Sequence, residues 1–229
     1  MTSQIHYRLP SKTKKDLLII LNPRNYKPSI KSLKSLNIPK VWITGYPEKE
    51  ALYEVNKIVA KGGYENYILQ ADDVIVKQEQ IDIIVNNNDT YDILSGYCCL
   101  SPQVRNINVA PVQWGKKITL NGKRPTKKDY PFYSKNYTYE NLHATIKGDI
   151  FETYSIGFSF TSFKKHVLQE YCLEAYDYQG GIASDHHISY RIITDGKYKM
   201  YVHKDCFFEH LKLKMKYQNR HRAITWDTV

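Results

Sequence analysis

The sequence predicts an α/β fold in which a central, mostly parallel sheet is flanked by helices. Two observations carry this prediction. Apolar runs of strand length alternate with segments of helical periodicity through the first half of the chain. Polar and acidic residues follow these runs where parallel strands would end, which is the edge of an open α/β sheet that binds ligands. At 229 residues, the chain is long enough for one domain with a buried core.

The elements of the first half follow in order from the first apolar run. Strands are expected at Asp16–Asn22, Lys40–Gly45, Asn66–Gln70 and Tyr91–Gly96. Helices are expected at Ser29–Leu36, across the apolar positions Leu52, Val55, Ile58 and Val59 up to a stop at Gly62 and Gly63, and at Glu79–Asn86. This alternation is typical of βαβ units.

The second half is irregular between residues 103 and 150, with strand-like pieces near Lys117–Leu120 and Leu142–Lys147. Order returns with an expected helix from Ser162 to about Tyr176. A glycine loop at Gly180 and Gly181 precedes a helix that starts near Ser184. Strands at Tyr198–His203 and Phe207–His210 then close the domain, and residues 211–229 form a basic tail.

Composition limits the classes of partner. The net charge of +10 implies an anionic partner: nucleic acid, acidic lipid or a phosphorylated small substrate. The tyrosines are scattered and form no nucleic-acid-binding motif, so no specific nucleic acid is expected. No run approaches the roughly 18 apolar residues of a membrane span, and the first residues lack a signal-peptide core, so a cytoplasmic location is expected. Without a CxxC spacing, the four cysteines are interpreted as reduced core residues.

Three segments contain residues suited to chemistry. Asp72 and Asp73 follow the third strand, where paired carboxylates suit Mg²⁺ or Mn²⁺, although an Asp pair is also common in caps and solvated turns. Asp185 opens a helix behind a glycine loop, where it can act as a general base or simply cap the helix. His210 ends an apolar run before the basic tail, as a metal ligand or a structural histidine.

The order of these segments resembles the GT-A fold glycosyltransferases, and most closely the inverting family 2 enzymes. The resemblance runs from about Leu17 to Lys214 through LLIILNPRN, EVNKIVAKGGYENYILQADDV, YDILSGY, YSIGFSFTSFKKHVL and SDHHISYRIITDGKYKMYVHKDCFFEHLK. Two positions depart from the family pattern: Gln70 replaces the first acid of its D-x-D motif, and Ser184 stands before Asp185 where Glu is frequent.

The resemblance implies a role for each candidate residue. Asp185 would be the catalytic base, and a divalent ion, Mn²⁺ or Mg²⁺, would be held by Asp72, Asp73 and His210. The sugar-nucleotide donor would be bound by Asn22, Arg24, Asn56, Asp72, Lys212 and Lys214. The resemblance also divides the domain into a nucleotide-sugar-binding half (residues 1–100), an acceptor-binding half (101–210) and the tail, which is expected to close over the donor diphosphate.

The function expected from this resemblance is metal-dependent transfer of a sugar, of the hexosyltransferase type, from a nucleotide-diphosphate donor to an acceptor hydroxyl with inversion. The acceptor would be a glycan, a protein or a lipid-linked molecule, and the basic tail could contact a membrane surface peripherally. Two alternatives stay open on the residues alone. One is a nucleotidyltransferase on a related α/β scaffold, although LNPRNYKP lacks a glycine-rich phosphate loop. The other is a basic nucleic-acid-binding protein.

Overall fold

The computed structural model describes residues 4–6, 14–22, 27–100, 105–115, 137–174, 177–178, 181–182, 184–218 and 221–228. Its helices are α1 (Lys27–Ser35), α2 (Glu48–Lys61), α3 (Gln78–Asn87), α4 (Tyr139–Thr145), α5 (Lys165–Glu170) and α6 (Ser184–Asp195), with a 3₁₀ turn at Val112–Trp114. Its strands are β1 (Gln4–His6), β2 (Lys14–Asn22), β3 (Lys40–Thr44), β4 (Tyr64–Ala71), β5 (Val74–Ile75), β6 (Ile93–Cys98), β7 (Ile150–Thr153), β8 (Thr161–Lys164), β9 (Asp177–Tyr178), β10 (Gly181–Ile182), β11 (Met200–Gln218) and β12 (His221–Thr228).

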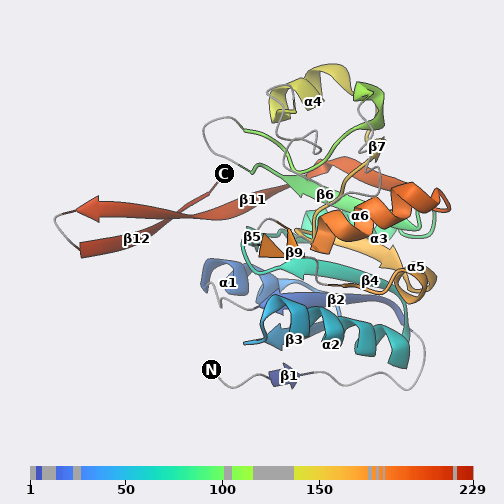
Figure 1. Ribbon diagram of the computed structural model, residues 1–229, viewed down its shortest axis with the longest axis horizontal. Helices are drawn as coiled ribbons and strands as arrows, with labels where there is room; N and C mark the ends of the chain where they lie inside the picture. The colour runs from blue at the N-terminus through green and yellow to red at the C-terminus, as the bar shows by residue number, and fades with distance from the viewer. Residues whose placement is uncertain are drawn as a thin grey trace.

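A central open sheet runs through the molecule in the order β1-β3-β2-β4-β8-β6-β11-β12 (Figure 1). β2 pairs in parallel with β3 and β4, and β6 pairs in parallel with β11. β8 is inserted antiparallel between β4 and β6. The predicted fold class is therefore confirmed: a mostly parallel sheet in which the first three expected strands, β2, β3 and β4, lie side by side.

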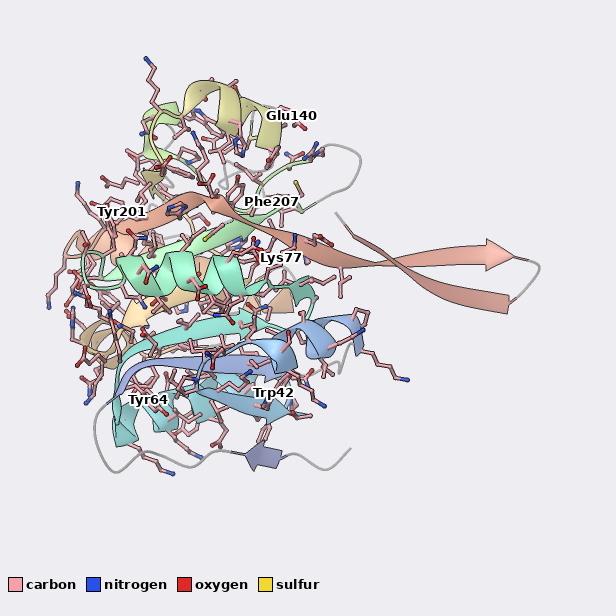
Figure 2. All side chains as sticks on the ribbon, turned by 180° about the vertical axis from the view of Figure 1, so that it is seen from behind. Trp42, Tyr64, Lys77, Glu140, Tyr201 and Phe207 are labelled. Carbon is pink, nitrogen blue, oxygen red and sulfur yellow. The ribbon has the colours of Figure 1, made fainter. Side chains whose placement is uncertain are left out.

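Helices cover both faces of this sheet, because successive residues of each buried strand point to opposite faces. Leu17, Ile19 and Leu21 of β2 pack in one core cluster with residues of α2, α5 and α6. Leu18 and Ile20 pack in a second cluster with residues of α1 and α3, the face seen from behind in Figure 2. Each fully buried Leu or Ile contributes about 1.5–3 kcal/mol of transfer free energy, so β2 alone anchors both layers.

Two elements of the second half differ from the sequence prediction. The helix expected from Ser162 is instead β8 followed by the short α5, because the Thr161–Lys164 backbone bridges β4 and β6 and closes the gap between them. The strand-like piece at Leu142–Lys147 lies largely in helix α4, whose N-cap Thr138 accepts a hydrogen bond from the Asn141 amide. Leu142 and Ile146 then face a third apolar cluster. The piece at Lys117–Leu120 lies outside the described residues.

The end of the chain also differs. Instead of two short strands and a tail, β11 is one strand with a register shift between Val202 and Phe207, and it continues to Gln218. β12 pairs with it antiparallel to form a long hairpin. The predicted glycine loop contributes Gly181 to a small hairpin of β9 and β10, while Gly180 lies outside the described residues.

Two predictions from composition have different outcomes. Cys98, Cys99 and Cys206 are free and buried as expected, and Cys98 and Cys99 face different core clusters. Cys172 is exposed, so the core interpretation is wrong for that residue.

Among the described residues, no helix is long and apolar enough to cross a membrane. The central sheet contains strands from both proposed halves, and the boundary at residue 100 stays a prediction.

Candidate active site

The acidic pair lies where it was predicted, in the turn that joins β4 to β5 at the carboxyl end of β4. Asp72 is fully buried, whereas the Asp73 side chain is 16% exposed. The Ala71 amide, just before the pair, donates a hydrogen bond of 2.8 Å to the Phe158 carbonyl. The turn is thus anchored to the β7–β8 loop, and Asp73 is the member of the pair that reaches solvent.

β11 brings His210 to this turn from 137 residues away in the sequence. β5 pairs antiparallel with β11, with Val74 opposite His210, and the Leu211 amide donates to the Asp73 carbonyl at 2.6 Å. The His210 Nε2 atom then lies 3.1 Å from Asp73 Oδ2. Two of the three predicted metal ligands are therefore held together by backbone pairing as well as by their side chains.

The other ring nitrogen of His210 fixes the tautomer. Nδ1 lies 2.9 Å from the Cys99 carbonyl oxygen, which can only accept, so Nδ1 carries a hydrogen. The Cys98 thiol is a more distant neighbour, with its sulfur 3.7 Å from Nδ1. A histidine held in this way directs Nε2 toward Asp73, and a backbone carbonyl on the far nitrogen is the usual support of a metal-ligating imidazole.

Two opposing effects act on the charge of His210. Burial disfavours the imidazolium and lowers the pKa of His210. Hydrogen bonds to Asp73 and Cys98, together with the charge of the Asp73 carboxylate, outweigh burial and raise the pKa to about 10. At neutral pH, the metal-free protein therefore holds an imidazolium–carboxylate ion pair at this position. A metal ion that binds Nε2 must displace that proton.

The geometry of the pair fits a divalent ion. Ligand atoms that bind one octahedral ion at about 2.1 Å lie about 3.0 Å apart when they are neighbours in the coordination sphere. The 3.1 Å between His210 Nε2 and Asp73 Oδ2 matches that separation. Among the described residues, no three His, Cys, Asp or Glu side chains converge as a ready ligand cluster. Ions of this type are commonly held by one or two side chains together with substrate phosphates and water.

Two buried amides lie at the same edge of the sheet. Asn22 ends β2 and Gln70 lies near the end of β4, which pairs with β2. Within the part of the chain that the structure describes, Asn22 Oδ1 and Gln70 Oε1 are both buried without a hydrogen-bond partner. Each side chain donates through its nitrogen, Asn22 to Thr44 Oγ1 and Gln70 to the Ala71 carbonyl. A buried acceptor without a donor costs about 1–3 kcal/mol, so these oxygens suit a ligand that supplies N–H or O–H groups.

Asp185 lies in the first turn of α6 as predicted, and its Oδ1 accepts from the His186 amide at 2.8 Å. The β7–β8 loop links this turn to the acidic pair. In that loop, the Ile156 amide donates a hydrogen bond to Ser189 Oγ of α6, and the Phe158 carbonyl accepts one from the Ala71 amide. The base candidate and the metal candidates are thus attached to one short segment.

The remaining donor-site candidates have other placements. Both amide atoms of Asn56 bond to the Leu173 backbone, at 2.8 and 2.9 Å, and tie α2 to the segment after α5. Lys212 and Lys214 lie on β11 opposite Asp227 and Thr225 of β12. Arg24 lies outside the described residues.

The contribution of Cys99 was missed by the sequence prediction. It acts through its backbone carbonyl, so its residue type carries no signal, and it lies 111 residues from His210. Gln70 had a signal in the sequence, since it stands at the position of the first acid of the D-x-D motif in the resemblance.

Comparison with protein-family models and with curated proteins returns no match to the sequence. Among solved structures, the chain is similar to A197 from STIV, with a TM-score of 0.50 and 16% identity over 92% of this chain and 97% of that chain. At this identity, the similarity shows the fold alone. The central, mostly parallel open sheet flanked by helices is consistent with the GT-A-like fold expected from the sequence. The chain also matches residues 1–349 of S. aureus TarS, with a TM-score of 0.43 and 12% identity over 85% of this chain and 59% of that one.

Proposed function

We propose that this protein is a metal-dependent glycosyltransferase that moves a sugar from a nucleotide-diphosphate donor to an acceptor hydroxyl. The observation that carries the proposal is the Asp73–His210 pair at the carboxyl edge of a GT-A-like sheet. The Cys99 carbonyl holds the Nδ1 hydrogen of His210, which leaves Nε2 as the nitrogen that would bind a metal once its proton is displaced. Ligands of open α/β sheets bind at this edge.

Asp73 and His210 would hold the ion, with Asp72 beside them in the same turn. When bound, Mn²⁺ or Mg²⁺ supplies Lewis-acid stabilisation of the departing diphosphate. The unpartnered oxygens of Asn22 and Gln70 accept hydrogen bonds from the nucleoside part of the donor.

Asp185 would take the proton from the acceptor hydroxyl. It lies in the first turn of α6, where its Oδ1 accepts a hydrogen bond from the His186 amide. The β7–β8 loop makes hydrogen bonds to both α6 and the acidic turn, which supports a role for Asp185 beside the donor site. Attack from the face opposite the diphosphate inverts the sugar carbon.

The proposal is tested by binding before turnover. A thermal-shift screen of sugar nucleotides with Mn²⁺ should give one donor that raises the melting temperature, since a ligand at 100 times its Kd stabilises by about 2.7 kcal/mol. The shift should need the metal and should be lost in His210→Gln. His203, also on β11 but with its Nδ1 accepting from the Asp205 amide, provides the matched control His203→Gln. Equal shifts in both variants would contradict the assignment of His210.

Electron paramagnetic resonance of Mn²⁺ gives a readout independent of the donor. Wild type and His203→Gln should reduce the free Mn²⁺ signal, and Asp73→Asn and His210→Gln should not. No uptake of Mn²⁺ by the wild type, with or without a nucleoside diphosphate, would remove the metal from the proposal.

A further inference from the structure

The C-terminal hairpin, β11 from Leu211 together with β12, leaves the body of the molecule. Both views show its two strands extending away from the sheet and helices (Figures 1 and 2). Leu211 is only 4% exposed and marks where β11 leaves the core. Among the described strands, β12 pairs with β11 alone. A two-stranded hairpin that projects in this way is marginally stable in water, so a surface that receives it would add to its stability.

The register divides the hairpin into two faces, because residues directly opposite in an antiparallel pair share a face and successive residues alternate. One face is apolar along most of its length and carries Leu213, Met215, Ile224 and Trp226. The other is basic along β11, with Lys212, Lys214 and Lys216, and has Asp227, Thr225 and Ala223 opposite them on β12. The strand register therefore places most of the apolar residues on one face of the hairpin and the lysines on the other.

We propose that this hairpin docks the protein on an anionic membrane surface, with its apolar face in the headgroup boundary and its cationic residues among the lipid phosphates. Residues 211–228 contain five Lys and Arg residues and one carboxylate, Asp227. Stable interfacial binding combines an apolar face with basic residues, and each Lys or Arg near an anionic leaflet contributes about 1 kcal/mol.

Charge selects this occupant over a second copy of the chain. Two copies of a hairpin with the same excess of cations would repel one another on contact, and the whole chain carries +10. An anionic bilayer offers the opposite charge and an apolar layer together. The proposal does not depend on the glycosyltransferase assignment, and its failure would leave the Asp73–His210 site untouched.

The test measures binding of the full chain to phosphatidylcholine vesicles with and without phosphatidylglycerol. Binding is expected on the anionic vesicles and is expected to weaken with salt. The double variant Lys216→Glu/Arg222→Glu should bind about 30-fold more weakly, since each lost cation removes about a factor of five. The matched control Lys31→Glu/Lys34→Glu changes the net charge equally at exposed positions of α1 and should bind within a few-fold of wild type.

A second variant tests the apolar face at constant charge. Met215→Ser/Ile224→Ser should weaken vesicle binding while circular dichroism stays that of the wild type. Equal loss in the hairpin and α1 charge variants, or full binding by the hairpin variants, would overturn the proposal. A further result would also overturn the proposal: the wild type fails to bind vesicles but forms a dimer, and Met215→Ser/Ile224→Ser dissociates that dimer. This result would assign the apolar face to self-association.

Discussion

Replacing Asp73 with Asn should destabilise the metal-free protein in a pH-dependent way. Asn keeps an oxygen near His210 Nε2 but removes the charge that holds the imidazolium. The pKa of His210 stands at about 10 in the folded protein against an ordinary 6.5. At about 1.4 kcal/mol per pH unit, that difference corresponds to on the order of 3–5 kcal/mol, of which Asp73 supplies a part, because Cys98 also raises the pKa of His210. Loss of one partner from a buried ion pair costs about the same.

The sign of the pH dependence follows from the direction of the shift. A group with a raised pKa in the folded state stabilises fully below its unfolded pKa, and this stability is lost as pH rises through the folded pKa. The wild type should therefore lose its advantage over Asp73→Asn between pH 6.5 and about 10.

Urea unfolding, followed by circular dichroism at a series of pH values in EDTA, measures this difference. The free energies of unfolding of the two proteins should differ most near pH 6 and converge toward pH 10. For the control variant His203→Gln, whose histidine lies on the same strand, the difference in unfolding free energy from the wild type should not shrink toward pH 10. A difference between wild type and Asp73→Asn that stays constant from pH 6 to 10 would refute the ion pair as the source.

Three further substitutions test separate parts of the account. Asp185→Asn should lower turnover about 10²- to 10⁴-fold with little change in donor affinity, and collapse of donor binding instead would move this residue to the donor site. Asn56→Ala should cost about 1–3 kcal/mol of unfolding free energy, because both of its bonds to the Leu173 backbone are lost, and donor affinity should stay unchanged. Gly96→Ala should destabilise by about 1–3 kcal/mol in urea titrations, since a Cβ would lie 1.9 Å from the Phe208 ring; a neutral result would show that the ring can move away.

The first half of the fold was predictable because its signals are local. The apolar run of β2 and the helical spacing of α2 each depend on neighbouring residues, and Gly62, with a φ of 74°, ends α2 where only a residue without a side chain fits easily. β8 was not predictable in the same way. Its residues continue toward α5 without a break, and only the space between β4 and β6 makes them a strand.

The candidate site divides along the same line. Asp73 and His210 were predicted because their residue types are those of metal ligands and their order along the chain matches a known pattern. Their contact depends on β5 pairing with β11, which no local signal encodes. Asn56 was assigned to the donor site by its position in the family resemblance, and that assignment stays a prediction. In the structure, hydrogen bonds to the Leu173 backbone use both of its polar side-chain atoms, and no local signal encodes these long-range bonds.

The most direct test of the central claim is turnover with and without the metal. The sugar nucleotide found by thermal shift is incubated with the protein and candidate acceptors, and release of the nucleoside diphosphate is followed in Mn²⁺, in excess EDTA and after Mn²⁺ is restored. Transfer should stop in EDTA, return with Mn²⁺ and be absent in Asp73→Asn and His210→Gln while His203→Gln stays active. Full turnover in excess EDTA would contradict a metal-dependent transferase centred on the Asp73–His210 pair.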